Sequence, residues 1–172
     1  NTVIGLYTDD MGNTWALLNN GINILFYNKP LSVKTQADGI ESAVMAVEYF
    51  NETEYIGTYS SILYRNANDE KFSKLSSDPA VCWTFLRKDD RLLASYGFDI
   101  VEVNGTGLKS IYNGNTSYSL ALSPKFNDII FSGQDGLYAL KDDGTQLQEV
   151  FEFPECMDLP IRKIEFDHKG RL

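Results

Sequence analysis

Residues 53–66 read TEYIGTYSSILYRN, two short apolar stretches on either side of a small polar turn. This pattern predicts a β-hairpin, because strands are rich in β-branched and aromatic residues and are separated by turn residues. A lone hairpin is only marginally stable in water, so the fold depends on whether the pattern recurs. Similar stretches occur at 13–28, 91–104 and 128–141.

The hairpins repeat at spacings of 40, 38 and 37 residues along the first strand. In this alignment one position is held by Trp15, Tyr55, Leu93 and Ile130. Seven residues later a second position is held by Ile22, Ile62, Ile100 and Leu137. A fixed period of this length indicates a repeat architecture and not a series of unrelated hairpins.

Each hairpin is flanked by further predicted strands. Those before the hairpins, with one extra at the end of the chain, are 2–8, 43–50, 80–86, 118–123 and 161–166. Those after them are 31–35, 72–76, 108–112 and 147–153. The stretch 36–50 is the nearest to a helix, and its second half is interpreted as strand because the repeat requires one there.

Four antiparallel strands in each repeat are typical of a β-propeller blade. One such sheet cannot bury both faces alone, and stacking on its neighbours hides them. We therefore predict an all-β propeller segment over 1–172, with blades at about 2–35, 43–76, 80–112 and 118–153, and a fifth starting at 161–172. These would be about four blades of a larger ring, for which we expect seven blades. A closed four-bladed ring is the alternative.

The stretch TDDMGNTW (8–15) is interpreted as a turn between strands. An Asp side chain can accept backbone N–H groups across a tight turn, and a Gly can supply positive φ. The stretch also fits the Asp-box pattern of sialidase-like propellers, at Thr8, Asp10, Gly12, Thr14 and Trp15. Calcium would need six to eight oxygen ligands, and hydrolysis would need carboxylates that converge across a cleft.

The repeats resemble those of the two-component regulator propeller family. The residues that carry this resemblance are Asp9, Gly12, Asn13, Trp15 and Gly21-Ile22, with YIGT (55–58), GQDGLY (133–138) and DHKGRL (167–172). In the second and third copies, Asn51-Glu52 and Asp89-Asp90 replace the Asp-x-x-Gly turn. The resemblance implies the periplasmic sensor region of membrane-anchored hybrid two-component histidine kinases of gut bacteria, with oligosaccharides as ligands.

Composition narrows the classes of function. The 172 residues carry a formal net charge of −9, which argues against a nucleic-acid partner. No apolar run is long enough to span a membrane, so we expect no membrane contact by this segment. Absence of an initiator Met and of a signal peptide suggests a mature or excised chain. Cys82 and Cys156 are either two reduced thiols or one disulfide.

We predict no catalytic residues, no metal site and no cofactor. His168 is the only histidine and lies in a predicted turn, so a catalytic triad has no positioned base. Three Asn-x-Ser/Thr sequences, at Asn51, Asn104 and Asn115, would matter only in a glycosylating host. No glycine-rich loop matches a phosphate-binding motif.

A ligand surface is predicted where the turns between second and third strands gather at one end of the repeats. Aromatic faces, amides and carboxylates suit sugar rings, which present C–H faces and hydroxyls. The alternative is that these are ordinary polar turns with aromatic side chains packed between blades. The candidate ligand-binding residues are Asn19, Asn20, Tyr59, Tyr96, Phe98, Asp99, Gln134 and Asp135.

Three functions are therefore compared. The leading hypothesis is a non-catalytic sensor segment that binds a carbohydrate or mediates a homodimer or contacts with other blades of the parent chain. The second is a fragment of a propeller glycoside hydrolase or lyase whose catalytic residues lie elsewhere. The third is a protein-interaction scaffold.

Overall fold

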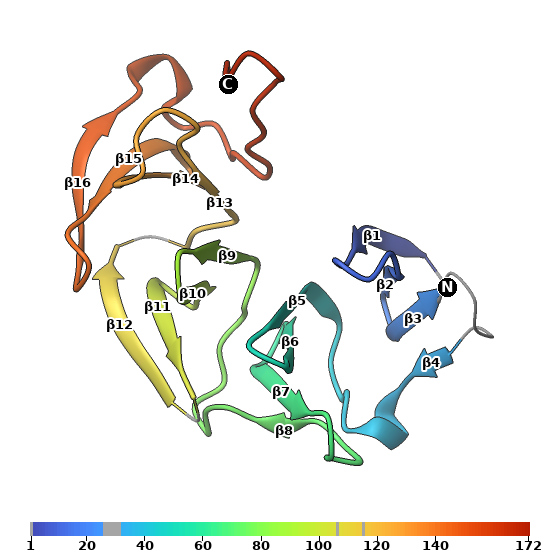
Figure 1. Cartoon of the computed structure of the whole chain (residues 1–172). Coiled ribbons are helices and arrows are strands. Elements are labelled where there is room, and N and C mark those ends of the chain that lie inside the picture. Colours follow the sequence, from blue (N-terminus) through green and yellow to red (C-terminus); the bar gives the residue numbers. More distant parts are fainter. Residues whose placement is uncertain (1, 26–31, 106, 115) are drawn as a thin grey trace. The chain divides into compact units, whose positions relative to one another are not determined.

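The computed structural model describes residues 2–25, 32–105, 107–114 and 116–172 (Figure 1). Within these residues the strands form four four-stranded antiparallel sheets, each in simple chain order. The predicted all-β class and the four-stranded repeat are confirmed. We number the sheets blades 1 to 4. The predicted first blade, 2–35, includes residues 26–31, which lie outside the described residues.

The chain divides into two compact units, Asn1–Cys82 and Trp83–Leu172. The first unit holds blades 1 and 2, with a short 3-10 helix, η1 (Gln36–Asp38), between them. Blade 1 comprises β1 (Val3–Thr8), β2 (Thr14–Leu18), β3 (Gly21–Leu25) and β4 (Ser32–Lys34). Blade 2 comprises β5 (Val44–Phe50), β6 (Thr53–Thr58), β7 (Ile62–Asn66) and β8 (Ser73–Lys74).

The second unit holds blades 3 and 4, followed by η2 (Pro154–Cys156) and the C-terminal segment. Blade 3 comprises β9 (Phe85–Lys88), β10 (Arg91–Tyr96), β11 (Asp99–Asn104) and β12 (Gly107–Asn113). Blade 4 comprises β13 (Ser119–Leu122), β14 (Ile129–Gln134), β15 (Gly136–Asp142) and β16 (Leu147–Glu152).

The core of the first unit lies between the facing sides of blades 1 and 2. Successive side chains of a strand point to opposite faces, so paired residues share a face. Trp15 pairs with Ile24 on one face of blade 1, and Ile56 pairs with Leu63 on one face of blade 2. Both faces belong to one buried cluster: Trp15, Leu17, Ile22, Ile24, Ile40, Val44, Val47, Ile56, Leu63 and Phe72.

The second unit repeats this arrangement. Leu93 of blade 3 and Ile130 of blade 4 belong to one buried cluster, so both side chains contribute to the core that the two sheets share. The rest of the cluster is Ile100, Ile111, Leu120, Tyr138, Leu140 and Leu147. In both units, therefore, apolar faces of neighbouring blades supply the core, as the repeat predicts.

The predicted equivalence of Ile130 with Leu93 is wrong by one residue. A single residue, Asp135, connects β14 to β15, whereas two residues, 97–98, connect β10 to β11. The shorter connection shifts the register, so Phe131 of blade 4 takes the place that Leu93 has in blade 3. A shift of one residue moves a side chain to the opposite face, which is why Ile130 points back toward blade 3. The second aligned position is buried in all four blades: Ile22, Ile62, Ile100 and Leu137.

Two of the strands predicted before the hairpins are also wrong: one begins later than predicted, and the other is absent. The strand predicted at 80–86 begins only at Phe85, because the backbone N–H of Cys82 still bonds to the carbonyl of Thr58 in blade 2 (2.9 Å). Residues 161–166, all of them described, belong to no strand. There the N–H of Ile161 bonds to the carbonyl of Gln134 in blade 4 (2.8 Å). Both segments thus bond to the preceding blade where strand was predicted.

Glycines at one position of the repeat permit this close approach. Gly57 pairs with Ile62, and Gly133 pairs with Leu137. A Cβ atom at Gly57 would lie 2.8 Å from the carbonyl oxygen of Cys82, and one at Gly133 would lie 2.6 Å from that of Ile161. Any larger residue would push the incoming segment away from the strand end to which it bonds.

Gly57→Ala should therefore lower the free energy of unfolding by about 1–3 kcal/mol, the usual cost of overpacking a close contact. Gly107→Ala is the matched control, because the nearest atom to its Cβ is 3.8 Å away. The control should change stability by less than about 0.5 kcal/mol. Urea unfolding of both variants measures the difference, and equal stabilities would contradict the steric role of Gly57.

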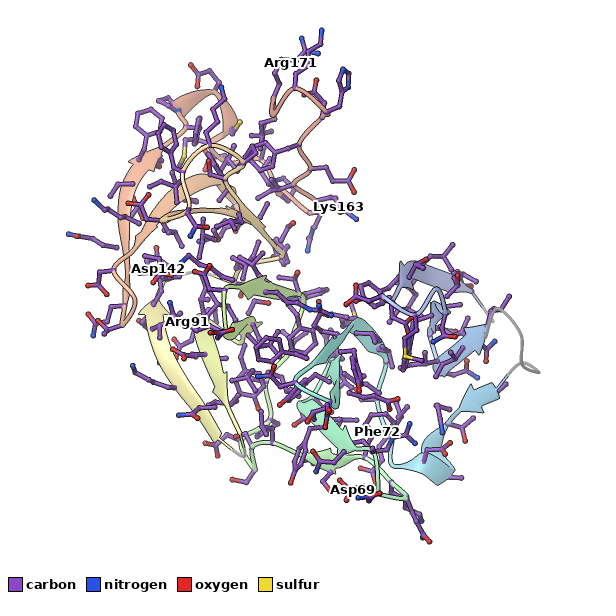
Figure 2. The ribbon with its side chains drawn as sticks, in the orientation of Figure 1. Asp69, Phe72, Arg91, Asp142, Lys163 and Arg171 are labelled. Carbon is purple, nitrogen blue, oxygen red and sulfur yellow. The ribbon has the colours of Figure 1, made fainter. Side chains whose placement is uncertain are left out.

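A buried ion-pair network joins blades 3 and 4 (Figure 2). The side chain of Asp142, at the end of β15, is fully buried and lies 2.7 Å from Arg91 Nη1 and 3.2 Å from Lys88 Nζ. Arg91 also donates to Glu102 Oε2 (3.1 Å), and the N–H of Gly144 donates to Asp142 Oδ1 (2.9 Å). Two cations from blade 3 therefore hold one carboxylate of blade 4.

Candidate functional site

A turn organised by Asp9 connects β1 to β2. Asp9 Oδ1 accepts the backbone N–H groups of Met11 (3.0 Å) and Asn13 (2.9 Å). Asp9 Oδ2 accepts Asn13 Nδ2 (2.9 Å) and Trp15 Nε1 (3.1 Å). Gly12 has φ +80°, a conformation that favours glycine. The interpretation of TDDMGNTW as a strand connector is confirmed, and Asp9, not Asp10, is the residue that accepts these four hydrogen bonds.

The same turn recurs at the end of the chain. Asp167 Oδ1 accepts the N–H groups of Lys169 and Arg171, both at 2.9 Å, and Gly170 has φ +70°. Arg171 Nε donates to Asp167 Oδ2 (2.8 Å), as Asn13 Nδ2 does to Asp9. Asp167 and Gly170 of DHKGRL (167–172) have the same spacing as Asp9 and Gly12, and they therefore form the same turn in three dimensions.

The Asp9 turn forms one wall of a cavity of about 500 Å³ in the first unit. Blade 1 contributes the turn and the strands behind it, and blade 2 contributes the ends of β5, β6 and β7. The lining residues are Asp9, Asp10, Met11, Asn13, Trp15, Ile24, Lys34, Tyr49, Glu54 and Arg65. Aromatic, amide, carboxylate and guanidinium groups thus converge on one concave space.

Burial alone would raise the pKa of the Asp9 carboxyl, but the hydrogen bonds from Asn13, Trp15 and the turn backbone outweigh it and lower that pKa. Asp9 is therefore a fixed negative charge at neutral pH. Its acceptor sites are already used by the turn, so its contribution to the cavity is mainly its charge and the orientation it imposes on Trp15 and Asn13.

The opposite wall carries an oriented ion pair. Arg65 on β7 donates through Nε (2.8 Å) and Nη2 (2.5 Å) to Glu54 Oε2 on the neighbouring strand β6. The guanidinium also stacks over the ring of Phe72, with 4.8 Å from Cζ to the ring centroid. Two independent contacts therefore restrict Arg65 to one orientation before any ligand arrives.

The predicted ligand residues of the first unit lie elsewhere. Asn19 and Asn20 line a separate depression of about 250 Å³ with residues 36 and 40–43. Tyr59 is 62% exposed, and its backbone N–H bonds to the carbonyl of Ala43 in the wall of that depression. The structure thus brings Asn19, Asn20 and Tyr59 to the same end of the unit, away from the Asp9 turn.

In the second unit the predicted residues are divided. Phe98 is exposed in the β10–β11 turn, Tyr96 and Asp99 flank it, and Asp99 accepts Asn113 Nδ2. Asp135 is exposed and forms a β-bridge with Pro160. The expectation that Gln134 is a surface residue is wrong: it is 1% exposed, and its Nε2 donates to Ser132 Oγ (3.0 Å). The one-residue connection draws Gln134 into β14.

The cavity residues Tyr49, Glu54 and Arg65 were not among the sequence-predicted site residues. They lie within strands β5, β6 and β7, outside the turns from which the candidate residues were taken, and no sequence motif includes them. The nearest sequence signal was the Asp9 turn, which was interpreted as structural only. The sequence of a single repeat does not predict a concave surface that forms only when two blades pack together.

Comparison with known proteins identifies solved structures with a similar fold. No protein-family model matches the chain, and no curated protein matches it. Among solved structures, the extracellular domain of BT4673 from B. thetaiotaomicron matches with a TM-score of 0.76, 17% identity, 99% of this chain covered and 25% of that chain covered. BT4673 is described both as a one-component and as a hybrid two-component system.

A second match is the extracellular domain of BT3049 from the same organism, described as a hybrid two-component system. Its TM-score is 0.64 at 15% identity, with 88% of this chain and 25% of that chain covered. The β-propeller domain of Cps50 from Myceliophteria thermophila matches with a TM-score of 0.57 at 13% identity, over 83% of this chain and 56% of that chain. The chain has a β-propeller fold.

The chain spans about a quarter of the length of the matched extracellular domains of BT4673 and BT3049. Among the described residues, no helix has the length and apolar character needed to cross a bilayer. Nor does the described part of the chain bring three or more His, Cys, Asp or Glu side chains together as a metal site. Cys82 and Cys156 are both reduced thiols, outside any disulfide.

Proposed function

We propose that this chain is a non-catalytic propeller segment of a periplasmic sensor in a hybrid two-component system, and that it binds a carbohydrate. The observation that carries this proposal is the match of 99% of the chain, at a TM-score of 0.76, to the extracellular domain of a signalling protein. The cavity of the first unit supports it, because aromatic and hydrogen-bonding side chains that converge on a concave space are suited to a small ligand.

Binding would act on signalling only if the ligand prefers one arrangement of the sensor over another. A cavity whose walls come from two blades meets that requirement, since its width depends on how blades 1 and 2 pack. The ligand would therefore favour one packing of these blades, and the rest of the sensor would transmit that preference.

Contact with other blades or with a second copy is the partner interaction we propose. Leu6 pairs with Ala16, and Val33 pairs with Asn23, so these side chains lie on the face of blade 1 opposite Trp15. Leu6 is 69% exposed and Val33 is 52% exposed. Light scattering of the purified chain, with Leu6→Asp as the variant, tests a homodimer.

Calorimetric titration of the full chain with fragments of plant and host glycans tests the proposed function, with chromatography of each mixture for products. The expected result is heat with at least one carbohydrate and no product. Turnover of a bound glycan would identify a hydrolase or lyase instead. Absence of heat with every sugar would favour an interaction scaffold and contradict carbohydrate binding.

A further inference from the structure

We infer that the cavity beside the Asp9 turn is the ligand site and that it takes an uncharged, hydroxyl-rich oligosaccharide while excluding anionic ones. This inference rests on the proposed function, and it adds the place and the charge class of the ligand. It differs from the sequence prediction, whose candidate residues in this unit, Asn19, Asn20 and Tyr59, lie away from the Asp9 turn and whose other five candidates lie in the second unit.

The size of the space is the first argument. The cavity of about 500 Å³ adjoins a second of about 230 Å³, and the two share Tyr49, Glu54 and Arg65. Small-molecule sites commonly occupy about 300–1,000 Å³. The shared residues lie where the two cavities meet, so a ligand longer than one sugar ring would contact them from both sides.

Preorganised hydrogen-bonding groups are the second argument. A sugar hydroxyl both donates and accepts, and an Arg–Glu pair offers guanidinium donors next to carboxylate acceptors. Arg65 is held by Glu54 through two N–H groups and by Phe72 through stacking. Because these contacts fix its orientation in advance, binding would not need to restrict the guanidinium further.

An accessible aromatic ring is the third argument. Trp15 lines the cavity but is only 4% exposed, and its indole N–H is used by Asp9. Tyr49, at the end of β5, lines both cavities and is 37% exposed. Among the described residues that line the cavity, Tyr49 is therefore the aromatic ring that a sugar C–H face can cover.

Charge is the fourth argument and selects the class of ligand. Among the described residues, the larger cavity is lined by three carboxylates, Asp9, Asp10 and Glu54, and by two cations, Lys34 and Arg65. Within the same part of the chain, the adjoining cavity adds Glu52 and Asp69 without a further cation. A uronate or sulfate group would meet this excess of negative charge, and like charges at short range disfavour binding. A neutral sugar meets no such penalty.

The test is calorimetry on the full chain with two sets of probes. The neutral set consists of trisaccharides of glucose, xylose, mannose and galactose, and the charged set consists of trigalacturonate and sulfated disaccharides. Wild type should bind at least one neutral trisaccharide and none of the charged probes. Tyr49→Ala should weaken that binding about tenfold or more, as loss of a central aromatic contact does.

Two control variants separate the site from the fold. Tyr49→Phe keeps the ring and should bind within about twofold of wild type. Tyr59→Ala removes an equally large but more exposed ring at the other candidate surface and should leave binding unchanged. Circular dichroism of each variant should match wild type, because neither tyrosine is buried.

The outcomes distinguish the inference from the proposed function. Binding of charged probes alone, or a loss of neutral-sugar binding in Tyr59→Ala with none in Tyr49→Ala, would overturn the inference and leave carbohydrate sensing intact. An unchanged affinity in Tyr49→Ala would overturn it as well. If wild type binds neither set, both the inference and carbohydrate binding are wrong.

Discussion

Replacing Asp142 with Ala should lower the free energy of unfolding of the second unit by about 3 kcal/mol, the lower end of the usual cost of breaking a buried ion pair. The variant removes the buried carboxylate that Arg91 and Lys88 share, and among the described residues each cation keeps only one, less buried partner, Glu102 or Asp89. Asp142 is fully buried and contacts both Arg91 and Lys88, whose own side chains are 16% and 10% exposed. Urea unfolding measures the loss, and hydrogen exchange at amides of β10 and β15 locates it in this unit.

Asp128→Asn is the matched control for Asp142→Ala. Asp128 also pairs with a lysine, Lys141, at 3.7 Å, but both side chains are more than half exposed. Exposed ion pairs contribute little, so this variant should change stability by less than about 0.5 kcal/mol. A loss below about 1 kcal/mol in Asp142→Ala would contradict the structural importance of the network.

The same network predicts a dependence of stability on pH. Burial alone would raise the pKa of Asp142, but hydrogen bonds from Arg91, the Gly144 N–H and Lys88 outweigh it and hold the pKa below the ordinary value of 3.8. A carboxyl with a depressed pKa in the folded state stabilises the fold above its unfolded pKa, and that stability is lost as the pH falls below it.

The free energy of unfolding of the second unit, measured in urea, should therefore decrease as the pH falls through 3.8 and below. The decrease should be smaller in Asp142→Asn, which lacks the titrating carboxyl group. Parallel acid sensitivity in wild type and variant would show that other carboxyls cause the effect.

Replacing Trp15 with Ala should lower the free energy of unfolding of the first unit by about 3–5 kcal/mol, the usual cost of removing a large buried aromatic side chain. Trp15 is 4% exposed, belongs to the core between blades 1 and 2, and donates its indole N–H to Asp9. The variant therefore loses apolar burial and leaves one acceptor of the Asp9 turn without its donor.

Trp15→Phe separates these two effects, because it keeps most of the apolar contact and removes only the indole N–H. Its loss should be smaller than that of Trp15→Ala. Met11→Ala, at a 79% exposed position of the same turn, should change stability by less than about 0.5 kcal/mol. Urea unfolding measures all three variants, and a loss in Met11→Ala as large as in Trp15→Ala would contradict the core role of Trp15.

The repeat, the all-β class and the Asp9 turn could be predicted from the sequence because each depends on short-range chemistry. Strand composition and turn residues act over a few neighbouring positions, so TDDMGNTW and DHKGRL predict the same turn wherever they lie. The prediction was wrong where the length of a strand connection, and not the local sequence pattern, set the strand register. One residue fewer in the β14–β15 connection buried Gln134 and turned Ile130 to the other face.

Sequence alone therefore determined that the chain is a row of four-stranded repeats, since period and turn chemistry are properties of the polypeptide. Tertiary structure alone decided which side chains meet between repeats. Arg91 and Asp142 are 51 residues apart in sequence, and the cavity walls at Asp9 and Arg65 come from different blades. Such contacts depend on how whole sheets pack against one another. The apolar residues that drive this packing can be recognised in the sequence, but they do not predict which polar side chains the packing brings together.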